Sequence, residues 1–240
     1  MTFGINELND GLRDFEALAI LMLDASGTMA QEELKTKERK SLRVAVMVQD
    51  LLNALDDLRY AAVSITICCF SADKGEAKII SLLEGYCPYD LKTYTGGPPE
   101  HWDGLSDKHR AQGMGHGTPI GTAIEWARKH AEGWILAAPG QVQRRAVIYL
   151  LSDGMNNIGL NGMDQKKLIQ EFNQTCEKGE IKLATIGYFQ SDESPSGTLT
   201  NPEEEAGRQL LNDLRLNEYA YFESDDVEKI GRYILETVTP

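Results

Sequence analysis

The stretch that decides the fold reads LAILMLDASGT and covers residues 18–28. Its first six residues are apolar without interruption, which indicates a strand that is buried on both faces of a sheet. An aspartate and two hydroxyl side chains, Asp24, Ser26 and Thr28, then follow at alternate positions. Such residues often form the turn after a strand, so this stretch alone predicts a strand followed by a turn. A functional interpretation depends on the segments that the fold places beside it.

Further apolar runs along the chain predict a mostly parallel sheet. They have the length of strands and cover residues 63–70, 77–83, 146–151, 183–189 and, more weakly, 219–222. Helical patterns, with apolar residues every three or four positions, occur around 44–58, 120–131, 168–176, 210–214 and 227–234. Residues 71–76 are too few for a crossover helix, so the second and third runs should form an antiparallel hairpin. We therefore expect a Rossmann-like three-layer α/β/α sandwich with about six strands, one of them antiparallel.

The chain shows neither an internal repeat nor a linker that would separate two domains. We expect one domain over residues 1–240, with an N-terminal extension over 1–16 and a core from about 17 to 236. Two long polar segments rich in Gly and Pro, residues 85–117 and 191–202, fit neither strand nor helix patterns. Long segments of this kind tend to be functional, and we expect both at the surface.

The charge balance makes nucleic acid and membrane surfaces poor partners. Asp and Glu outnumber Lys and Arg by 37 to 24, which gives a net charge of -13 that repels phosphates. The first seventeen residues lack the pattern of a secretory signal, and no apolar stretch approaches the ~20 residues of a membrane helix. The four cysteines form no C-x-x-C pair, and the adjacent Cys68 and Cys69 should point to opposite faces of a strand. These features predict a cytoplasmic protein with reduced thiols.

Two distant segments can meet the loop that follows residue 23. Asp153 ends the run at 146–151 in LLSDG, and Thr118 lies in GHGTPIGTAI, where it should cap a helix with Pro119 in the first turn. Doubly wound sheets commonly change direction between their first and fourth strands, which would make Asp24 and Asp153 neighbours. Each feature alone also fits a turn, a helix cap or a strand exit. Together they form a set of oxygen donors that suits Mg²⁺, with Mn²⁺ or Ca²⁺ as other possibilities.

The three motifs DASGT, HGTPIGTAI and LLSDG resemble, in this order, the metal-ion-dependent adhesion site of the von Willebrand factor A (VWA) domain. The family pattern is D-x-S-x-S, then a distant Thr in a Gly-rich loop, then a distant Asp at a strand end. The similarity extends over residues 18–234 and includes the early hairpin. The chain is most similar to the intracellular bacterial kind, such as the tellurium-resistance-associated proteins.

The resemblance implies that hydroxyl groups ligate the metal directly or through water, and that two aspartates mainly hold coordinated waters. The hydroxyl groups would be those of Ser26, Thr28 and Thr118, and the aspartates Asp24 and Asp153. Thr28 stands where the family more often has Ser, and His116 stands where a small residue is more usual. As a loop carboxylate that faces solvent, Asp24 should tolerate replacement by Ala without loss of the fold.

The implied function is metal-dependent protein binding without catalysis. An Asp or Glu of a partner protein would complete the coordination of the cation, so the chain would act as an adaptor or scaffold. Residues near the expected rim are candidates for further partner contacts, namely His101, Trp102, His116 and Asn156. Trp102 is either an exposed interface residue or the anchor of its own loop, and the sequence favours neither.

An enzyme is the alternative. DASGT also resembles the D-x-D-x-T loop of haloacid-dehalogenase-like Mg²⁺-dependent phosphatases, in which Asp24 would be the nucleophile. Ser26 stands in place of the second Asp, which removes the acid/base, and no persuasive lysine completes the site. Asp225 and Asp226 could imitate a late acidic motif, but they also suit the N-terminus of the last helix.

Overall fold

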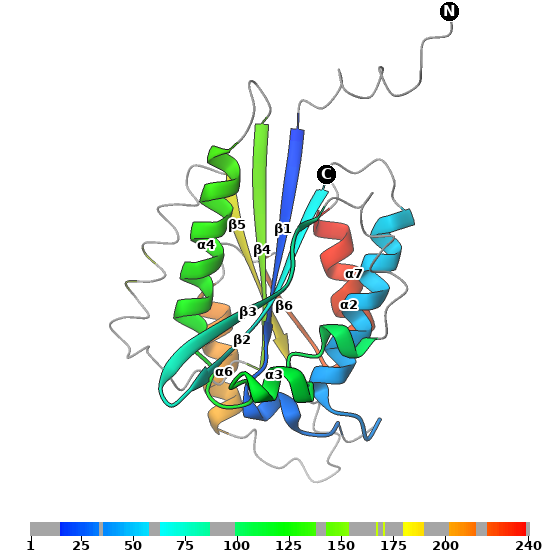
Figure 1. The fold of residues 1–240 in the computed structure, drawn as a ribbon, viewed down its shortest axis with the longest axis vertical. Coiled ribbons are helices and arrows are strands. Elements are labelled where there is room, and N and C mark those ends of the chain that lie inside the picture. Colours follow the sequence, from blue (N-terminus) through cyan, green and yellow to red (C-terminus); the bar gives the residue numbers. More distant parts are fainter. Residues whose placement is uncertain are drawn as a thin grey trace, which may run out of the picture.

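A six-stranded sheet forms the centre of the molecule in the computed structural model (Figure 1). The structure describes residues 15–33, 36–57, 63–86, 99–137, 143–153, 167, 170, 180–189, 202–214 and 220–238. The strands are β1 (Phe15–Asp24), β2 (Val63–Asp73), β3 (Glu76–Tyr86), β4 (Gln143–Ser152), β5 (Ile181–Tyr188) and β6 (Tyr221–Ser224). Their order is β3-β2-β1-β4-β5-β6, and only β3 is antiparallel to its neighbour among these strands.

The order of the strands confirms that the sheet changes direction between its first and fourth strands. β1 pairs with β2 on one side and with β4 on the other, both in parallel. Asp24 lies opposite Phe70 of β2, and Leu23 lies opposite Leu151 of β4. The carboxyl ends of β1 and β4 are therefore adjacent, at the lower edge of the sheet in Figure 1, where α/β sheets commonly bind ligands.

Helices cover both faces of the sheet, as predicted for a three-layer sandwich. α2 (Lys40–Asp57) and α7 (Val227–Val238) pack on one face, and α4 (Ile120–Leu136) and α6 (Pro202–Asp213) on the other (Figure 1). β1 is buried on both sides, since Leu21 packs with α2 and Ile20 packs with α4. Cys68 and Cys69 likewise belong to opposite halves of the core. Of the helix expected around 168–176, the structure describes only residue 170, which is helical.

The predicted hairpin joins β2 and β3 through a turn of two residues, Lys74 and Gly75. Both residues have positive φ angles, 51° and 85°, which match the right-handed twist of the flanking strands. The strands extend closer to the turn than the apolar runs indicated, because the polar residues of SADKGE continue the ladder from Ser71 to Glu76.

Within residues 85–117, expected as a surface loop, the described part lies partly at the surface as predicted but is not a plain loop. Residues 99–117 contain a 3-10 helix, η3 (Pro99–Trp102), and a short helix, α3 (Asp107–Ala111). Trp102, Leu105 and Met114 are at most 2% exposed and join the core beside α2. Apolar side chains scattered in a polar segment thus anchor it, although their spacing has no helical or strand period. Residues 87–98 and 190–201 lie outside the described part of the chain.

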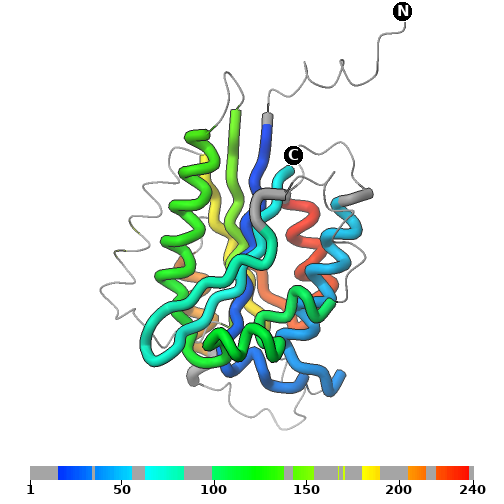
Figure 2. Tube along the Cα trace, viewed as in Figure 1, coloured from blue at the N-terminus to red at the C-terminus, as the bar shows by residue number. Residues whose placement is uncertain are grey.

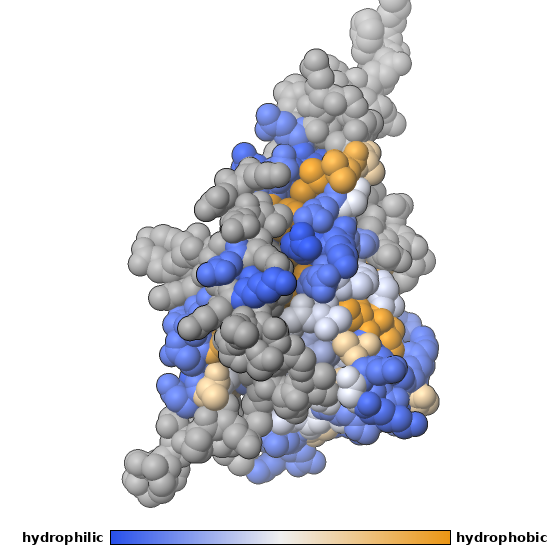
Figure 3. All heavy atoms as spheres, turned by 90° about the vertical axis from the view of Figure 1, so that its left-hand side faces the viewer, coloured by the Kyte–Doolittle hydropathy of each residue, from blue (hydrophilic) through white to orange (hydrophobic). Residues whose placement is uncertain are grey.

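The surface is largely polar on the side shown in Figure 3, where the coloured hydrophobic atoms form small patches. Leu136, at the end of α4, is the one large hydrophobic residue that is exposed among those the structure describes. Within the same residues, no helix is long and apolar enough to cross a membrane.

Candidate metal site

The first part of the candidate site is the end of β1 and the turn that follows it. Asp24 is the last residue of the strand and is 3% exposed. Its Oδ1 accepts a hydrogen bond of 2.8 Å from the backbone N–H of Ser26, a local pattern that turns the chain after an aspartate. The hydroxyl oxygens of Ser26 and Thr28 are 3.0 Å apart. The structure thus brings the donors of DASGT together, but the expectation that Asp24 faces solvent is wrong.

The second part is the end of β4, which lies beside the end of β1. The Ser152 hydroxyl donates a hydrogen bond of 2.5 Å to Asp24 Oδ2, and Asp153 follows directly. The pKa of Asp24 is raised to about 7, first because burial removes water from its carboxylate and second because Asp153 adds a negative charge. Asp24 and Asp153 are therefore neighbours, as predicted.

The third part is the loop that carries Thr118, which lies directly against the DASGT turn (Figure 2). The N–H of Gly27 donates to the carbonyl of His116, and the N–H of Gly115 donates to the carbonyl of Ala25, both at 2.9 Å. A Cβ atom on Gly27 would lie 3.2 Å from the Gly115 carbonyl oxygen, so the close approach of the two loops favours glycine.

Ser71 of β2 fixes the same loop from the other side and is fully buried. Its hydroxyl donates to the carbonyl of Gly117 at 3.2 Å and accepts the N–H groups of Gly115 and His116 at 3.3 and 3.2 Å. One hydroxyl thus holds three consecutive residues immediately before Thr118.

Thr118 lies between this loop and α4 and is 1% exposed. The expectation that it caps the helix is wrong, because α4 begins at Ile120 and Pro119 occupies the cap position without a side-chain hydrogen bond. Pro119, with a ψ of 65°, is not yet helical, so Thr118 lies one residue further from the first helical turn than predicted. Thr118 is therefore positioned by the loop that Ser71 and Gly27 hold, rather than by helix capping.

Asp153 supplies the observation that decides whether a cation fits. It is 3% exposed, and neither of its carboxylate oxygens has a hydrogen-bond partner among the residues that the structure describes. Among the described residues, its one ionic contact is with the ammonium of Lys40, whose Nζ is 3.6 Å from Oδ2. A buried carboxylate without hydrogen bonds is costly, so a second positive charge at this position would stabilise it.

The donor set has the chemistry of a hard divalent cation. It consists of carboxylate and hydroxyl oxygens, which Mg²⁺ prefers. The described part of the chain contains no cluster of three or more His, Cys, Asp or Glu residues that could hold a metal, so the candidate set depends on hydroxyl oxygens as well as on its two carboxylates. The residues present thus fit the predicted cation, and the assignment of Asp24, Ser26, Thr28, Thr118 and Asp153 as its site stays a prediction.

Lys40, Ser71 and Ser152 belong to the site, although the sequence interpretation did not include them. Lys40 lies in the charged run KTKERK, which is typical of a solvated segment, yet it is 6% exposed. Ser71 lies in β2, within residues 71–76 that the sequence pattern predicts as the hairpin turn. Ser152 could have been found from the parallel register, because it lies one position beyond the paired Leu23 and Leu151.

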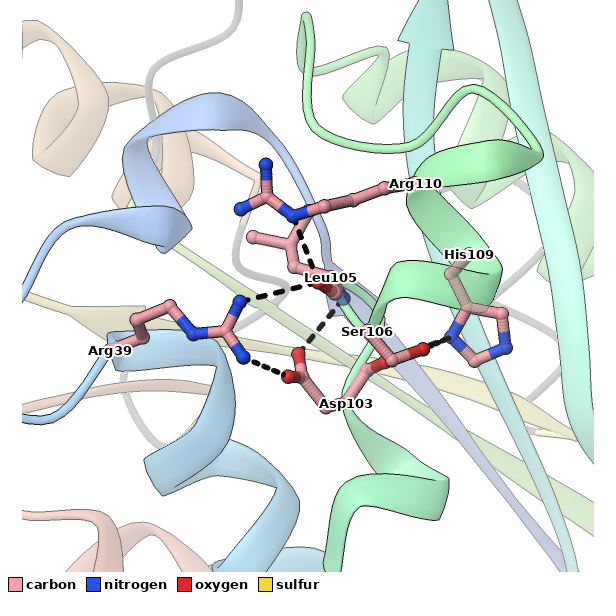
Figure 4. A network of polar contacts seen from close by, with 6 residues as sticks. All are labelled: Arg39, Asp103, Leu105, Ser106, His109 and Arg110. Carbon is pink, nitrogen blue, oxygen red and sulfur yellow. Dashed lines mark hydrogen bonds and ion pairs between the residues drawn. The ribbon is translucent and has the colours of Figure 1, made fainter.

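The start of α2, which carries Lys40, is held by a network of polar contacts (Figure 4). The guanidinium of Arg39 lies 2.9 Å from Asp103 Oδ2 and donates to the carbonyl of Leu105 at 3.3 Å. Asp103 Oδ1 accepts the N–H of Leu105, and Arg110 Nε donates to the same Leu105 carbonyl, both at 2.9 Å. The network joins the segment before α2 to the η3–α3 segment that leads into the Thr118 loop.

The rim residues divide into two groups. Trp102 is 2% exposed, and its Nε1–H donates to Gln49 Oε1 of α2 at 2.9 Å, so it anchors its own segment and is no exposed interface residue. His101 and His116 are exposed. The printed hydrogen bonds of His116 with the loop use its backbone, and the residue is exposed, so its bulk is accommodated at the surface. Asn156 lies outside the described residues.

Comparisons with known proteins relate the chain to solved structures at low sequence identity. No family model matches the chain, and no curated protein matches it. The PilB minor pilin from Streptococcus sanguinis has a TM-score of 0.62 at 14% identity, over 93% of this chain and 61% of that one. An aerotolerance-related membrane protein from Bacteroides fragilis has a TM-score of 0.54 at 14% identity, over 93% of this chain and 98% of that one.

BatB from Bacteroides thetaiotaomicron is a third neighbour, with a TM-score of 0.51 at 16% identity over 92% of this chain and 98% of its own. BatB and PilB are proteins with VWA domains. Likeness at this level of identity concerns the fold, and it agrees with the strand order, the single antiparallel strand and the helices on both faces. The chain therefore has the α/β fold of the von Willebrand factor A domain.

Proposed function

We propose that the chain is a metal-dependent protein-binding module, an adaptor or scaffold without catalytic activity of its own. The observation that carries the proposal is the buried Asp153 carboxylate, which has no hydrogen-bond partner in the described part of the chain and lies beside the buried carboxylate of Asp24. Two such groups are stabilised when a divalent cation shares them. The VWA-type fold supports an interaction module, since neighbours with this fold include a pilus adhesin, SpaC of Lactobacillus rhamnosus.

Each residue of the site has a distinct task in this proposal. Ser26, Thr28 and Thr118 would hold Mg²⁺ directly or through water, and Asp24 and Asp153 would mainly orient coordinated waters. The N–H of Ser26 and the hydroxyl of Ser152 fix both oxygens of Asp24 in one orientation. When bound, Mg²⁺ supplies an open coordination position that an Asp or Glu of a partner protein can fill. Because the proposed direct ligands are neutral hydroxyl groups, the bound cation would keep much of its positive charge. It would then attract acidic partners that a chain of net charge -13 otherwise repels.

The alternative of a phosphatase that uses Asp24 as its nucleophile is disfavoured by the same contacts. A nucleophilic carboxylate needs a free oxygen that can reach the phosphorus atom. Asp24 is 3% exposed, and each of its oxygens accepts a hydrogen bond. We therefore propose that this carboxylate orients the site and does not attack a substrate.

We also propose a cytoplasmic location and a relationship to the intracellular, tellurium-resistance-associated kind of VWA protein. Both proposals rest on the amino-acid sequence, namely its acidic composition, its cysteines and its three motifs. The structural neighbours have varied names, among them a membrane protein, pilus proteins and a TFIIH subunit, and these names favour no particular location.

The proposal is tested by capturing partners from a lysate of the source cell in Mg²⁺ and in EDTA. We expect a protein that binds the wild type only in Mg²⁺, that is lost with Thr118→Val, and that is retained by Thr122→Val at an exposed position of α4. Replacing one Asp or Glu of that partner should abolish binding. Metal-independent capture, or Mg²⁺-dependent hydrolysis of a phosphate ester that Asp24→Asn abolishes, would contradict the proposal.

A further inference from the structure

We propose that Lys40 is a built-in counter-charge of the candidate metal site, which weakens cation binding and strengthens binding of the partner's carboxylate. The inference rests on the proposed metal-dependent function and assigns a specificity-determining role to a residue outside the ligand set. It starts from the contact between the Lys40 ammonium and the Asp153 carboxylate.

The contact between Lys40 and Asp153 is buried, but it is too long for a hydrogen bond. The side chains of Lys40 and Asp153 are 8% and 4% exposed, so water screens their interaction weakly. The distance from Nζ to Oδ2 is 3.6 Å, which is longer than a hydrogen bond, and both Asp153 oxygens lack a hydrogen-bond partner within the described ranges. The ammonium therefore neutralises the carboxylate without occupying its lone pairs, which stay available for a cation or for its waters.

The position of Lys40 is imposed by its surroundings. Its backbone N–H donates to the Gln31 carbonyl at 3.0 Å, just after η1 (Gly27–Ala30). The preceding residue, Arg39, is tied to Asp103 and Leu105 (Figure 4). The start of α2 is thus fixed between the DASGT turn and the η3–α3 segment, and a long flexible side chain leaves it toward the end of β4.

Formal charges show what this placement does. In the loaded site, the ionised Asp24 and Asp153 contribute two negative charges, and Lys40 contributes one positive charge. A divalent cation brings the sum to plus one, whereas it would be zero without Lys40. The loaded site then attracts a carboxylate more strongly, and the empty site attracts a cation less strongly, than two aspartates alone would. Lys40 therefore shifts the selectivity of the site from cations toward the anionic partner.

A purely structural ion pair predicts a different result. If Lys40 only stabilised the start of α2, its removal would lower stability with and without metal and would leave metal affinity unchanged or reduced. The proposed role predicts opposite changes in two affinities, which a general loosening of the site cannot produce.

The test compares the wild type with Lys40→Met and with a matched control, Lys129→Met. Lys129 is 65% exposed and pairs with Glu125 on the surface of α4, so its loss changes the net charge equally at a remote place. Calorimetric titration of Mg²⁺ into chelator-treated protein should give a dissociation constant that is on the order of tenfold lower for Lys40→Met than for the wild type. Titration of acetate into the Mg²⁺-saturated proteins, followed by the NMR shifts of backbone amides, should show weaker binding to Lys40→Met.

The outcomes separate this inference from the proposed function. Lys40→Arg keeps the charge and should retain both wild-type affinities, and Lys40→Gln replaces Lys40→Met if the latter does not fold. Mg²⁺ binding by the wild type that Lys40→Met leaves unchanged or weakens would overturn the role of Lys40 and leave the proposed function intact. Absence of Mg²⁺ binding in both the wild type and the variant would overturn both.

Discussion

Ser152 and Asp24 join the ends of two neighbouring parallel strands through a buried hydrogen bond of 2.5 Å. The bond lies where the sheet changes direction, between β1 and β4. Because the other oxygen of Asp24 accepts a hydrogen bond from the N–H of Ser26, both carboxylate oxygens are held in place. A carboxylate fixed in this way can orient coordinated waters, and the two donors partly offset the burial and the Asp153 charge that raise its pKa.

Replacing Ser152 with Ala should weaken Mg²⁺ binding at neutral pH. The hydrogen bond from Ser152 lowers the pKa of Asp24 and opposes the effect of burial, so its loss should raise that pKa further above about 7. Protons would then compete more strongly with the cation. Calorimetric titration at two pH values checks this, with a larger loss of affinity expected at the lower pH. An equal loss at both would indicate that Ser152 acts through packing alone.

The raised pKa of Asp24 also predicts how the stability of the metal-free protein depends on pH. The pKa is about 7 in the fold against an ordinary value of 3.8, so between these values the fold holds a proton that the unfolded chain has released. The free energy of unfolding should therefore fall as pH rises through this window. Between about pH 5.5 and about pH 7.5 we expect a fall of about 2 kcal/mol that is absent in Asp24→Asn.

Urea unfolding of the wild type and of Asp24→Asn in EDTA measures the fall in unfolding free energy. Subtracting the two pH profiles cancels the contributions of other titrating groups. Saturating Mg²⁺ should abolish the slope near neutral pH, since the cation favours the ionised carboxylate. Parallel pH profiles for the wild type and Asp24→Asn would show that Asp24 titrates in the same range folded and unfolded.

Ser71→Ala should lower both stability and metal affinity, although Ser71 is no ligand. Its hydroxyl contacts three backbone groups of the Gly115–Gly117 loop, and their loss should cost about 1–3 kcal/mol. The loop would then hold Thr118 less firmly. Chemical denaturation and Mg²⁺ titration check the two effects, and Ser81→Ala, at an exposed position of β3, should change neither. Wild-type Mg²⁺ affinity in Ser71→Ala would refute this positioning role.

Trp102→Phe should destabilise the protein because Trp102 anchors the η3–α3 segment on α2. The variant removes the donor to Gln49 Oε1 in a buried place, and a cost of about 1–3 kcal/mol is expected. His101→Ala, at the exposed neighbouring position, should stay within about 0.5 kcal/mol of the wild type. An unchanged unfolding free energy for Trp102→Phe, together with weaker partner binding, would instead favour an interface role.

The sequence predicted the fold well because the four central strands of the sheet, β1, β2, β4 and β5, are largely buried on both faces. The run at 18–23 reads as one apolar block, and the six residues after Phe70 could only form a hairpin. The apolar character of a strand and the length of a connection are local properties of the sequence, so composition and spacing reveal them. The same reasoning placed Asp24 and Asp153 at one edge, since parallel strands end at the same edge of the sheet.

The sequence could not predict contacts that depend on how segments pack. Lys40 lies in a charged run that looks solvated, and only the docking of Arg39 on Asp103 and Leu105 places its ammonium beside Asp153. Trp102 was ambiguous for the same reason, because its partner Gln49 is 53 residues away in the chain. The burial of Asp24 was missed because a polar residue after a strand usually meets solvent.

The most direct test of the account is calorimetric titration of Mg²⁺ into chelator-treated wild-type protein, Asp24→Asn and Thr118→Val. Asn preserves the size of the buried Asp24 side chain, and Val preserves the shape of Thr118, so both variants should keep the fold by circular dichroism. We predict saturable binding of one Mg²⁺ per wild-type chain and its loss in both variants. Binding of equal affinity in all three proteins, or none in the wild type under conditions in which it is folded, would contradict the metal site.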